Sequence, residues 1–276
     1  MRPRFRLGLR AGATRCICAS VHDAPGHKLR AVDLHHEQAA EFDERYDVLA
    51  RDPYASIFTY GRKKIEELID RELAGEGALR ALDVGCGTGF NVQRLRERGF
   101  DVVGLEPAEG MRARAQANNP GAEIVDGDAE ALPFPDASFD LVLSIEVVRY
   151  LADPARAFAE MARVLRPGGR AIVTAAPLLS LYALVNFVTA RVEVPTFHRV
   201  KHSFLTEQSA RRVARAAGFA AAEVHGAFLG PWHVLARVWP GALAATLRAC
   251  EPLDDLLADR PILRDFSNHL VIVARR

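Results

Sequence analysis

The fold is decided by the stretch Leu82-Asp83-Val84-Gly85-Cys86-Gly87-Thr88-Gly89-Phe90. The apolar run that enters it, residues 81–84, predicts a short buried strand, and residues 91–98 after it predict an amphipathic helix. Glycines at such a strand-to-helix turn let the backbone approach a ligand closely. The stretch therefore predicts a ligand-binding turn at the carboxyl end of a strand.

The rest of the chain continues this alternation of short apolar runs and amphipathic segments. We expect a helical region at residues 37–73, broken near Asp52-Pro53, before the first strand. Strand and helix alternation predicts a parallel sheet covered on both faces. The further strands are expected at residues 102–105, 123–125, 141–144, 171–175, 220–228 and 269–274, and the further helices at 110–118, 154–165 and 206–217, with a largely helical insertion at 232–257.

Two nucleotide-binding motifs do not fit the glycine turn. A dinucleotide fingerprint needs a third glycine three places after the second, but Phe90 follows in one frame and Val92 in the other. No GxxxxGK[ST] motif occurs in the chain, so a P-loop is excluded as well. Nicotinamide chemistry is therefore disfavoured.

Acidic residues follow the first three predicted strands or lie at their ends. Asp83 precedes the first glycine. Glu106 stands 21 positions after Gly85, at the end of the next strand, where an acid can accept hydrogen bonds from both ribose hydroxyls. Asp128, next to Ala129, follows the third strand and can accept a hydrogen bond from the exocyclic amine of adenine. In open α/β sheets this edge binds ligands. A nucleoside carrying an amino acid, as in S-adenosylmethionine, fits these groups without any pyrophosphate.

At this point a family resemblance can be stated. Residues 79–176 resemble the class I S-adenosylmethionine-dependent methyltransferases that act on small molecules. The resemblance rests on LDVGCGTGF (82–90), VVGLEPAEGM (102–111), GDAEALPFPDASFDLVLS (127–144) and EMARVLRPGGRAIV (160–173), in the order of the family. It implies a Rossmann-like, doubly wound α/β sheet of seven strands, mostly parallel, whose antiparallel last strand lies beside the fifth.

The resemblance also implies a set of cofactor-binding residues. Asp83, Gly85 and Gly87 would lie near the methionine part, Glu106 on the ribose, and Asp128 with Ala129 on the adenine. Tyr46 is the matching position for a tyrosine that the family often places over the cofactor. The full set expected to bind S-adenosylmethionine is Tyr46, Asp83, Gly85, Cys86, Gly87, Gly89, Glu106, Pro107, Met111, Asp128, Ala129, Ser144 and Ile145.

The catalytic base is less well defined by the sequence. Many members of the family carry a histidine after the fourth strand where this chain has Tyr150. A compact basic group, His198, Arg199, Lys201 and His202, falls in a segment expected to overhang the crevice, although a solvated surface explains it more simply. His198, His202 and Tyr150 are the candidate bases. Positioning can supply most of the acceleration, so a base is an addition.

Composition limits the partners of the chain. The 36 Lys and Arg residues balance 35 Asp and Glu residues, so a general nucleic-acid substrate is not expected. No apolar run is long enough to span a membrane. Four dispersed cysteines argue against a disulfide framework and favour a reducing cytoplasm. The spacing of Cys16 and Cys18 with His22 and His27 matches no usual zinc site, so no metal is expected.

The sequence predicts one methyltransferase domain with additions. Residues 1–35 form a basic arm, and residues 36–276 form the domain, with a helical cap (37–75), a cofactor-binding core (79–176) and substrate-covering insertions with the last strands (177–276). Apolar additions at 177–190 and 232–257 favour a small, partly apolar methyl acceptor. A non-catalytic S-adenosylmethionine sensor and another group transfer from a related nucleoside stay open as alternatives, as do the methylated atom and the oligomeric state.

Overall fold

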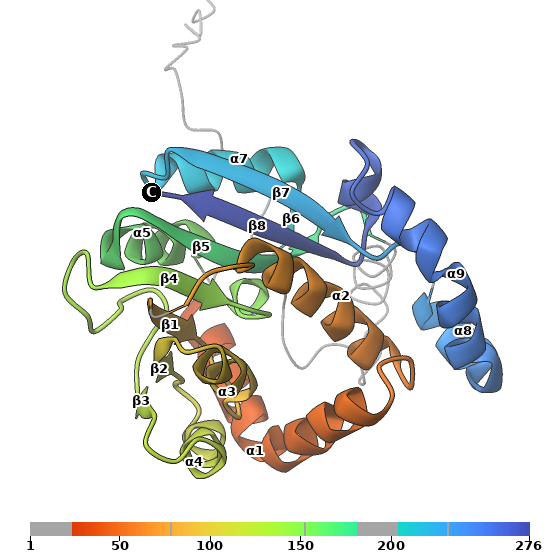
Figure 1. The fold of residues 1–276 in the computed structure, drawn as a ribbon, viewed down its shortest axis with the longest axis horizontal. Coiled ribbons are helices and arrows are strands. Elements are labelled where there is room, and N and C mark those ends of the chain that lie inside the picture. The colour runs from red at the N-terminus through yellow and green to blue at the C-terminus, as the bar shows by residue number, and fades with distance from the viewer. Residues whose placement is uncertain (1–23, 78, 152, 181–203, 231) are drawn as a thin grey trace, which may run out of the picture.

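The structure is a computed structural model that describes residues 24–77, 79–151, 153–180, 204–230 and 232–276 (Figure 1). A central sheet carries helices on both faces, as the alternation of strands and helices predicts. Within the described residues, none of the helices combines the length and the apolar character that crossing a bilayer requires. The apolar addition at residues 177–190 lies mostly outside the described residues. The basic group at residues 198–202 lies wholly outside them.

Seven strands form the main path of the sheet, in the order β3-β2-β1-β4-β5-β8-β7, and the short β6 pairs with the end of β5. The pairs among β1 to β5 are parallel, whereas β8 runs antiparallel to both β5 and β7. The expected antiparallel last strand beside the fifth is therefore confirmed. The strands are β1 (Arg80–Val84), β2 (Asp101–Leu105), β3 (Glu123–Val125), β4 (Phe139–Ser144), β5 (Leu165–Pro177), β6 (Phe204–Leu205), β7 (Ala221–Ala227) and β8 (His269–Arg275).

Local sequence explains where several helices begin. Ser56 and Thr59 form a capping box at the start of α2, and Thr206 and Ser209 form another at the start of α7. Asp153 caps α5 through Ala155 and Arg156, as its place before a proline predicts. The helices are α1 (Ala24–Arg51), α2 (Ile57–Glu72), α3 (Phe90–Glu97), α4 (Glu109–Asn118), α5 (Pro154–Val164), α7 (Glu207–Ala216), α8 (Trp232–Val238) and α9 (Leu243–Leu257), with short 3-10 turns at Val148–Tyr150, Pro240–Ala242 and Leu263–Phe266.

Two apolar clusters hold the layers together. One lies between the sheet and α5 with α7, and its largest members include Phe139, Phe158 and Met161. The other lies on the opposite face, under α2, α3 and the α8–α9 insertion, and includes Tyr60 and Ile65. Because both faces of the sheet are buried, the central strands consist of apolar runs without alternation.

Two boundaries differ from the sequence-based expectation. β5 covers Leu165–Pro177 and is much longer than the expected strand at 171–175. The extra length arises because Leu165, at the start of β5, already pairs with Phe139 of β4, and a register shift in β4 accommodates the residues around Gly168. α1 begins at Ala24, inside the range 1–35 expected to be an arm, and residues 1–23 lie outside the described part. The expected break between the two N-terminal helices is confirmed at residues 52–56.

Gly89 at the start of α3 carries a structural prediction. Its φ is +88°, and a Cβ there would lie 2.3 Å from Nδ2 of Asn119 and 3.1 Å from Cα of Ala115. We expect Gly89→Ala to lower the free energy of unfolding by more than the ~1–2 kcal/mol of a left-handed alanine, because Asn119 must also move. Gly99→Ala is the matched control, since Gly99 has φ +89° and nothing within 4 Å. Equal losses in urea unfolding would contradict the packing argument.

Candidate active site

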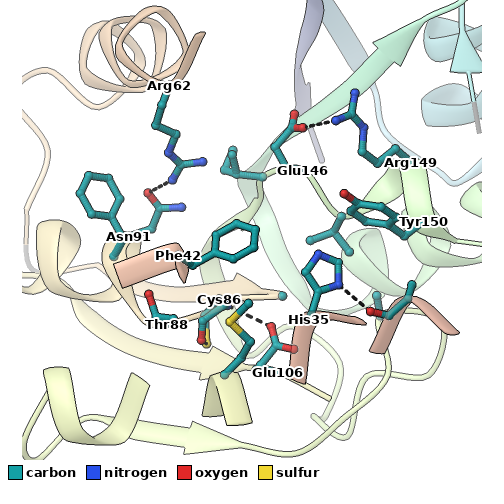
Figure 2. A pocket seen from close by; sticks show the side chains of 18 of the residues that line it. His35, Phe42, Arg62, Cys86, Thr88, Asn91, Glu106, Glu146, Arg149 and Tyr150 are labelled. Carbon is teal, nitrogen blue, oxygen red and sulfur yellow. Dashed lines mark hydrogen bonds and ion pairs between the residues drawn. The ribbon is translucent and has the colours of Figure 1, made fainter. Parts of the chain in front are cut away.

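A cavity of about 400 Å³ lies at the carboxyl edge of β1, β2 and β4, and α1 and α2 supply its other walls. This volume falls in the range of small-molecule sites. The cavity opens where the order of strands reverses between β1 and β4, the place where open α/β sheets bind ligands. Figure 2 shows side chains from the glycine turn, α1, α2 and the segment after β4 around one space.

The glycine turn is tied to the neighbouring strand through its backbone. Gly85 and Cys86 donate N–H bonds of 2.7 and 3.0 Å to the carbonyl of Leu105. Gly87 then donates a 2.9 Å bond to Oε2 of Glu106, whose Oε1 accepts from the backbone of Ala108 at 2.9 Å. Burial raises the pKa of Glu106 although these bonds act in the opposite direction. Glu106 thus fixes the turn and still lines the cavity.

Asp83 is the least solvated acid of the site. Its side chain is 1% exposed, and its Oδ2 has no hydrogen-bond partner among the described residues. Burial raises the pKa of Asp83 to about 7, and Glu106 adds to the rise, while Arg62 and Asn91 oppose it. A buried carboxylate with an unsatisfied oxygen favours the approach of a cationic ligand group.

An aromatic and cationic wall comes from α1, α2 and the start of α3. Tyr46 stacks on Phe90 with ring centroids 4.2 Å apart and planes at 7°. The guanidinium of Arg62 lies 5.6 and 5.3 Å from these two centroids, and its Nη2 donates a 2.7 Å bond to Asn91. Burial raises the pKa of Tyr46, so its hydroxyl is neutral. Arg62 and Asn91 lie on one side of the cavity in Figure 2.

The structure brings most of the sequence-predicted residues to this cavity. Those that line it are Tyr46, Gly85, Cys86, Gly87, Glu106, Pro107, Met111, Asp128, Ala129, Ile145 and the candidate base Tyr150. Asp83, Gly89 and Ser144 lie behind the lining, and Ser144 is fully buried. Burial holds the pKa of the Cys86 thiol well above its usual value, so the thiol stays protonated and is a poor nucleophile. His198 and His202 lie outside the described residues.

Several lining residues were not predicted from the sequence. They are His35, Arg62, Glu146, Arg149 and His269, which come from α1, α2, the segment after β4 and the start of β8. Nδ1 of His35 lies 2.7 Å from the carbonyl of Ala31, and its ring meets Tyr150 edge-on at 5.0 Å. Burial lowers the pKa of His35. Glu146 lies just after the end of β4, and this position is the signal that could have identified it from the sequence.

One group of carboxylates outside the cavity could suggest a metal. Glu67, Glu251 and Asp255 come together between α2 and α9. However, Lys64 contacts all three, with Nζ 2.5 Å from Glu67, and Lys63 contacts Glu67 and Glu251. Ammonium groups thus occupy the space between these acids, which makes the group an ion-pair network that joins the two helices.

Together, the sheet order and the acids at the strand ends define a Rossmann-like protein with a nucleoside-type crevice. Residues 82–173 match the model of a family described as a methyltransferase domain. A demethylmenaquinone methyltransferase of Beutenbergia cavernae is 32% identical over 184 residues, which cover 62% of this chain and 75% of that protein. The chain belongs to the class I S-adenosylmethionine-dependent methyltransferases, and S-adenosylmethionine is the cofactor of the family.

Two further matches agree with this assignment. The biotin biosynthesis bifunctional protein BioHC of Cellvibrio japonicus is 39% identical over 122 residues, covering 44% of this chain. The chain spans only 24% of that relative. Among solved structures, an S-adenosylmethionine-dependent methyltransferase of Mesorhizobium loti is 26% identical, with a TM-score of 0.55 over 77% of this chain and 98% of that one.

Proposed function

We propose that the protein transfers a methyl group from S-adenosylmethionine to a small, partly apolar metabolite by in-line displacement. The observation that carries this proposal is one cavity that joins the strand-end acids to apolar side chains of α1 and α2. The apolar contributions come from Ala31, Val32, Phe42, Ile57 and Phe58. The cavity thus offers a polar half for the cofactor and an apolar half for an acceptor.

The polar half fits the cofactor group by group. We assign Glu106 to the ribose, Asp128 with Ala129 to the adenine, and Asp83 behind the glycine turn to the ammonium of the methionine part. The unsatisfied Oδ2 of Asp83 supports this fit, because a cation would relieve its burial. Tyr46, Pro107, Met111 and Ile145 would enclose the cofactor, with Gly85, Cys86 and Gly87 beneath it.

The amino-acid end of the cofactor also carries a carboxylate, and Arg62 is the cation placed for it. Arg62 lines the cavity beside Asn91 and is 6% exposed. Its Nε lies 2.8 Å from Oε1 of Glu66, but Arg94 contacts the same carboxylate. Arg94 and Arg98 also share Asp70, so these three guanidinium groups face only two carboxylates. A positive charge therefore stays available beside Asp83, as a zwitterion requires.

This arrangement predicts a ligand-dependent loss of affinity. We expect Arg62→Ala to weaken the binding of S-adenosylhomocysteine by about 10–100-fold, the value of a charge-assisted hydrogen bond. The variant should bind 5′-methylthioadenosine within about 3-fold of the native protein, because that nucleoside lacks the amino acid. Titration calorimetry with both ligands measures the difference. Arg71→Ala is the control, because Arg71 is an exposed residue of the same helix, α2, and does not line the cavity. Equal weakening of both ligands by Arg62→Ala would contradict the assignment.

The protein's own contribution to methyl transfer is positioning. When bound, S-adenosylmethionine supplies a methyl group on a good sulfonium leaving group, so the nucleophile must be aligned with the carbon–sulfur bond. The apolar walls exclude water and hold the acceptor against the cofactor half. Tyr150 stays a candidate for contact with the acceptor, because it lines the cavity next to His35. His198 and His202 stay predictions.

The division of the chain follows from the same proposal. We assign residues 79–176 to cofactor binding, residues 37–75 to a helical cap over the cavity, and residues 177–276 to acceptor covering and the last strands, preceded by a basic arm at 1–35. A cytoplasmic location stays a prediction from the cysteine distribution. Methyl transfer to a panel of quinols, phenols, carboxylic acids and amines tests the function, and cofactor binding without any turnover would favour a sensor.

A further inference from the structure

A half-buried polar cluster lies at the ends of β4 and β5 and the start of β8. Glu146 follows β4, Thr174 lies in β5, and His269 is the first residue of β8. Glu146 and His269 both line the cavity. In Figure 2, Glu146 and Arg149 face the cavity from the side opposite Thr88 and Asn91. The cluster is thus separate from the glycine turn.

Glu146 is held in place by four contacts. Nη1 of Arg149 lies 2.7 Å from its Oε2, and the hydroxyl of Thr174 donates to its Oε1 at 3.1 Å. The Thr174 oxygen also accepts from the backbone N–H of Glu146 at 2.6 Å, and Nδ1 of His269 lies 2.9 Å from Oε1. The backbone of Glu146 has φ +65°, which is rare for a residue with a side chain. Backbone strain of this kind is concentrated at functional sites.

The charge of Glu146 favours one of the two neutral ring tautomers of His269. Burial acts to raise the pKa of Glu146, but Arg149, His269 and the bond from Thr174 lower it below its usual value. The carboxylate is therefore ionised and can only accept, which favours the tautomer of His269 that carries its proton on Nδ1, 2.9 Å from Oε1 of Glu146. In the neutral ring the lone pair then lies on Nε2. His269 lines the cavity, and the ring of Phe228 packs against it with centroids 5.5 Å apart.

We propose that His269 is the general base for a hydroxyl acceptor and that Glu146 is its positioning residue. This inference rests on the proposed methyltransferase function. The acceptor O–H bond breaks as its proton moves to Nε2, and the oxygen lone pair forms the new bond to the methyl carbon. The carbon–sulfur bond breaks with its electron pair remaining on sulfur. Glu146 balances the imidazolium, which later returns the proton to water.

The choice of a hydroxyl follows from the chemistry of the cluster. A neutral amine already presents a lone pair and does not need to lose its proton before attack. A hydroxyl of ordinary acidity gains about 10²–10⁴-fold from a positioned base. The charge of Glu146 is balanced by Arg149, so the cluster offers no excess cation for a strongly anionic acceptor.

Two phenols that differ in acidity separate a base from a structural residue. At pH 7.5, 4-methoxyphenol is protonated and pentafluorophenol is ionised. We expect His269→Gln to slow methylation of 4-methoxyphenol by about 10²–10⁴-fold and that of pentafluorophenol by less than about 3-fold. Glu146→Gln should also slow methylation of 4-methoxyphenol more than that of pentafluorophenol, with a smaller loss of rate. In this variant, ¹⁵N NMR should show that the ring of His269 is no longer fixed as the Nδ1–H tautomer.

A matched control lies elsewhere in the chain. His225 of β7 forms the same kind of pair, with Nδ1 2.9 Å from Oδ2 of Asp259, but it does not line the cavity. His225→Gln should leave both rates unchanged. Equal loss with both phenols in His269→Gln, an Nε2–H tautomer in the native protein, or a native protein that binds S-adenosylhomocysteine but methylates neither phenol would overturn the base. Absence of S-adenosylhomocysteine binding would instead overturn the proposed function itself, and this inference with it.

Discussion

Asp83→Asn is expected to make the unliganded protein more stable at pH 8 while weakening S-adenosylhomocysteine binding by about 100-fold. The loss of affinity follows from removing the buried partner of the ligand ammonium, which costs several kcal/mol in comparable charge pairs. The gain in stability follows because burial raises the pKa of Asp83 to about 7. An ionised Asp83 thus destabilises the unliganded folded protein, and the same charge is needed to bind the ligand.

The pH dependence has a definite sign. Because the folded pKa of Asp83 lies above the value of about 3.9 expected in an unfolded chain, the unfolded state loses its proton first. The free energy of unfolding therefore falls as pH rises from about 4 to about 7 and then levels off. The affinity for S-adenosylhomocysteine, in contrast, rises as the pH rises toward 7. Below pH 7 it should fall about tenfold per unit, because the ammonium needs the ionised form.

Thermal unfolding and calorimetry between pH 5 and 8 measure both effects. The stabilising effect of Asp83→Asn should be large at pH 8 and absent near pH 4. Asp101→Asn on β2 is the control, because its carboxylate is 76% exposed and should change neither quantity. A variant that binds S-adenosylhomocysteine as tightly as the native protein, or a pH-independent effect on stability, would contradict the role of Asp83.

The part of the site that could be predicted from the sequence is the part encoded locally. The glycine turn, Glu106 and Asp128 each follow a recognisable strand, and parallel pairing brings strand ends to one edge whatever the rest of the chain does. The antiparallel last strand was predicted by the family resemblance alone, and the structure confirms it. Sequence alone gave no reason to extend β5 back to Leu165, because a Pro-Gly-Gly turn predicts a break.

The part that could not be predicted depends on contacts between distant segments. Arg62 has the spacing of a solvated helix residue, yet α2 packs it over Phe90 and Asn91. Glu146 and His269 meet only because β8 is inserted antiparallel beside β5, which brings the start of the last strand to the same edge of the sheet as the end of β4, with β5 between them. No short motif links these two residues, so a histidine at a strand start carried no functional signal. Of the candidate bases predicted from the sequence, His198 and His202 were chosen for the local charge of their segment, and Tyr150 for its position after the fourth strand.

Glu106→Ala is expected to weaken S-adenosylhomocysteine binding by about 10–100-fold. Glu106 is placed to accept from the ribose hydroxyls, and hydrogen bonds to a charged group contribute about 1.5–3 kcal/mol. The same carboxylate accepts from the backbone of Gly87 and Ala108, so its removal also loosens the turn that supports the methionine part. One substitution thus removes both a ligand contact and a support of the turn.

Calorimetry with paired ligands separates these two losses. Adenosine and 2′,3′-dideoxyadenosine differ only in the hydroxyls, so native protein should prefer adenosine and Glu106→Ala should lose that preference. Glu109→Ala is the control, because Glu109 is an exposed acid three positions after Glu106, at the start of α4. If Glu106→Ala weakened both nucleosides equally, Glu106 would serve the turn alone and the ribose would have to be held by another group of the cavity.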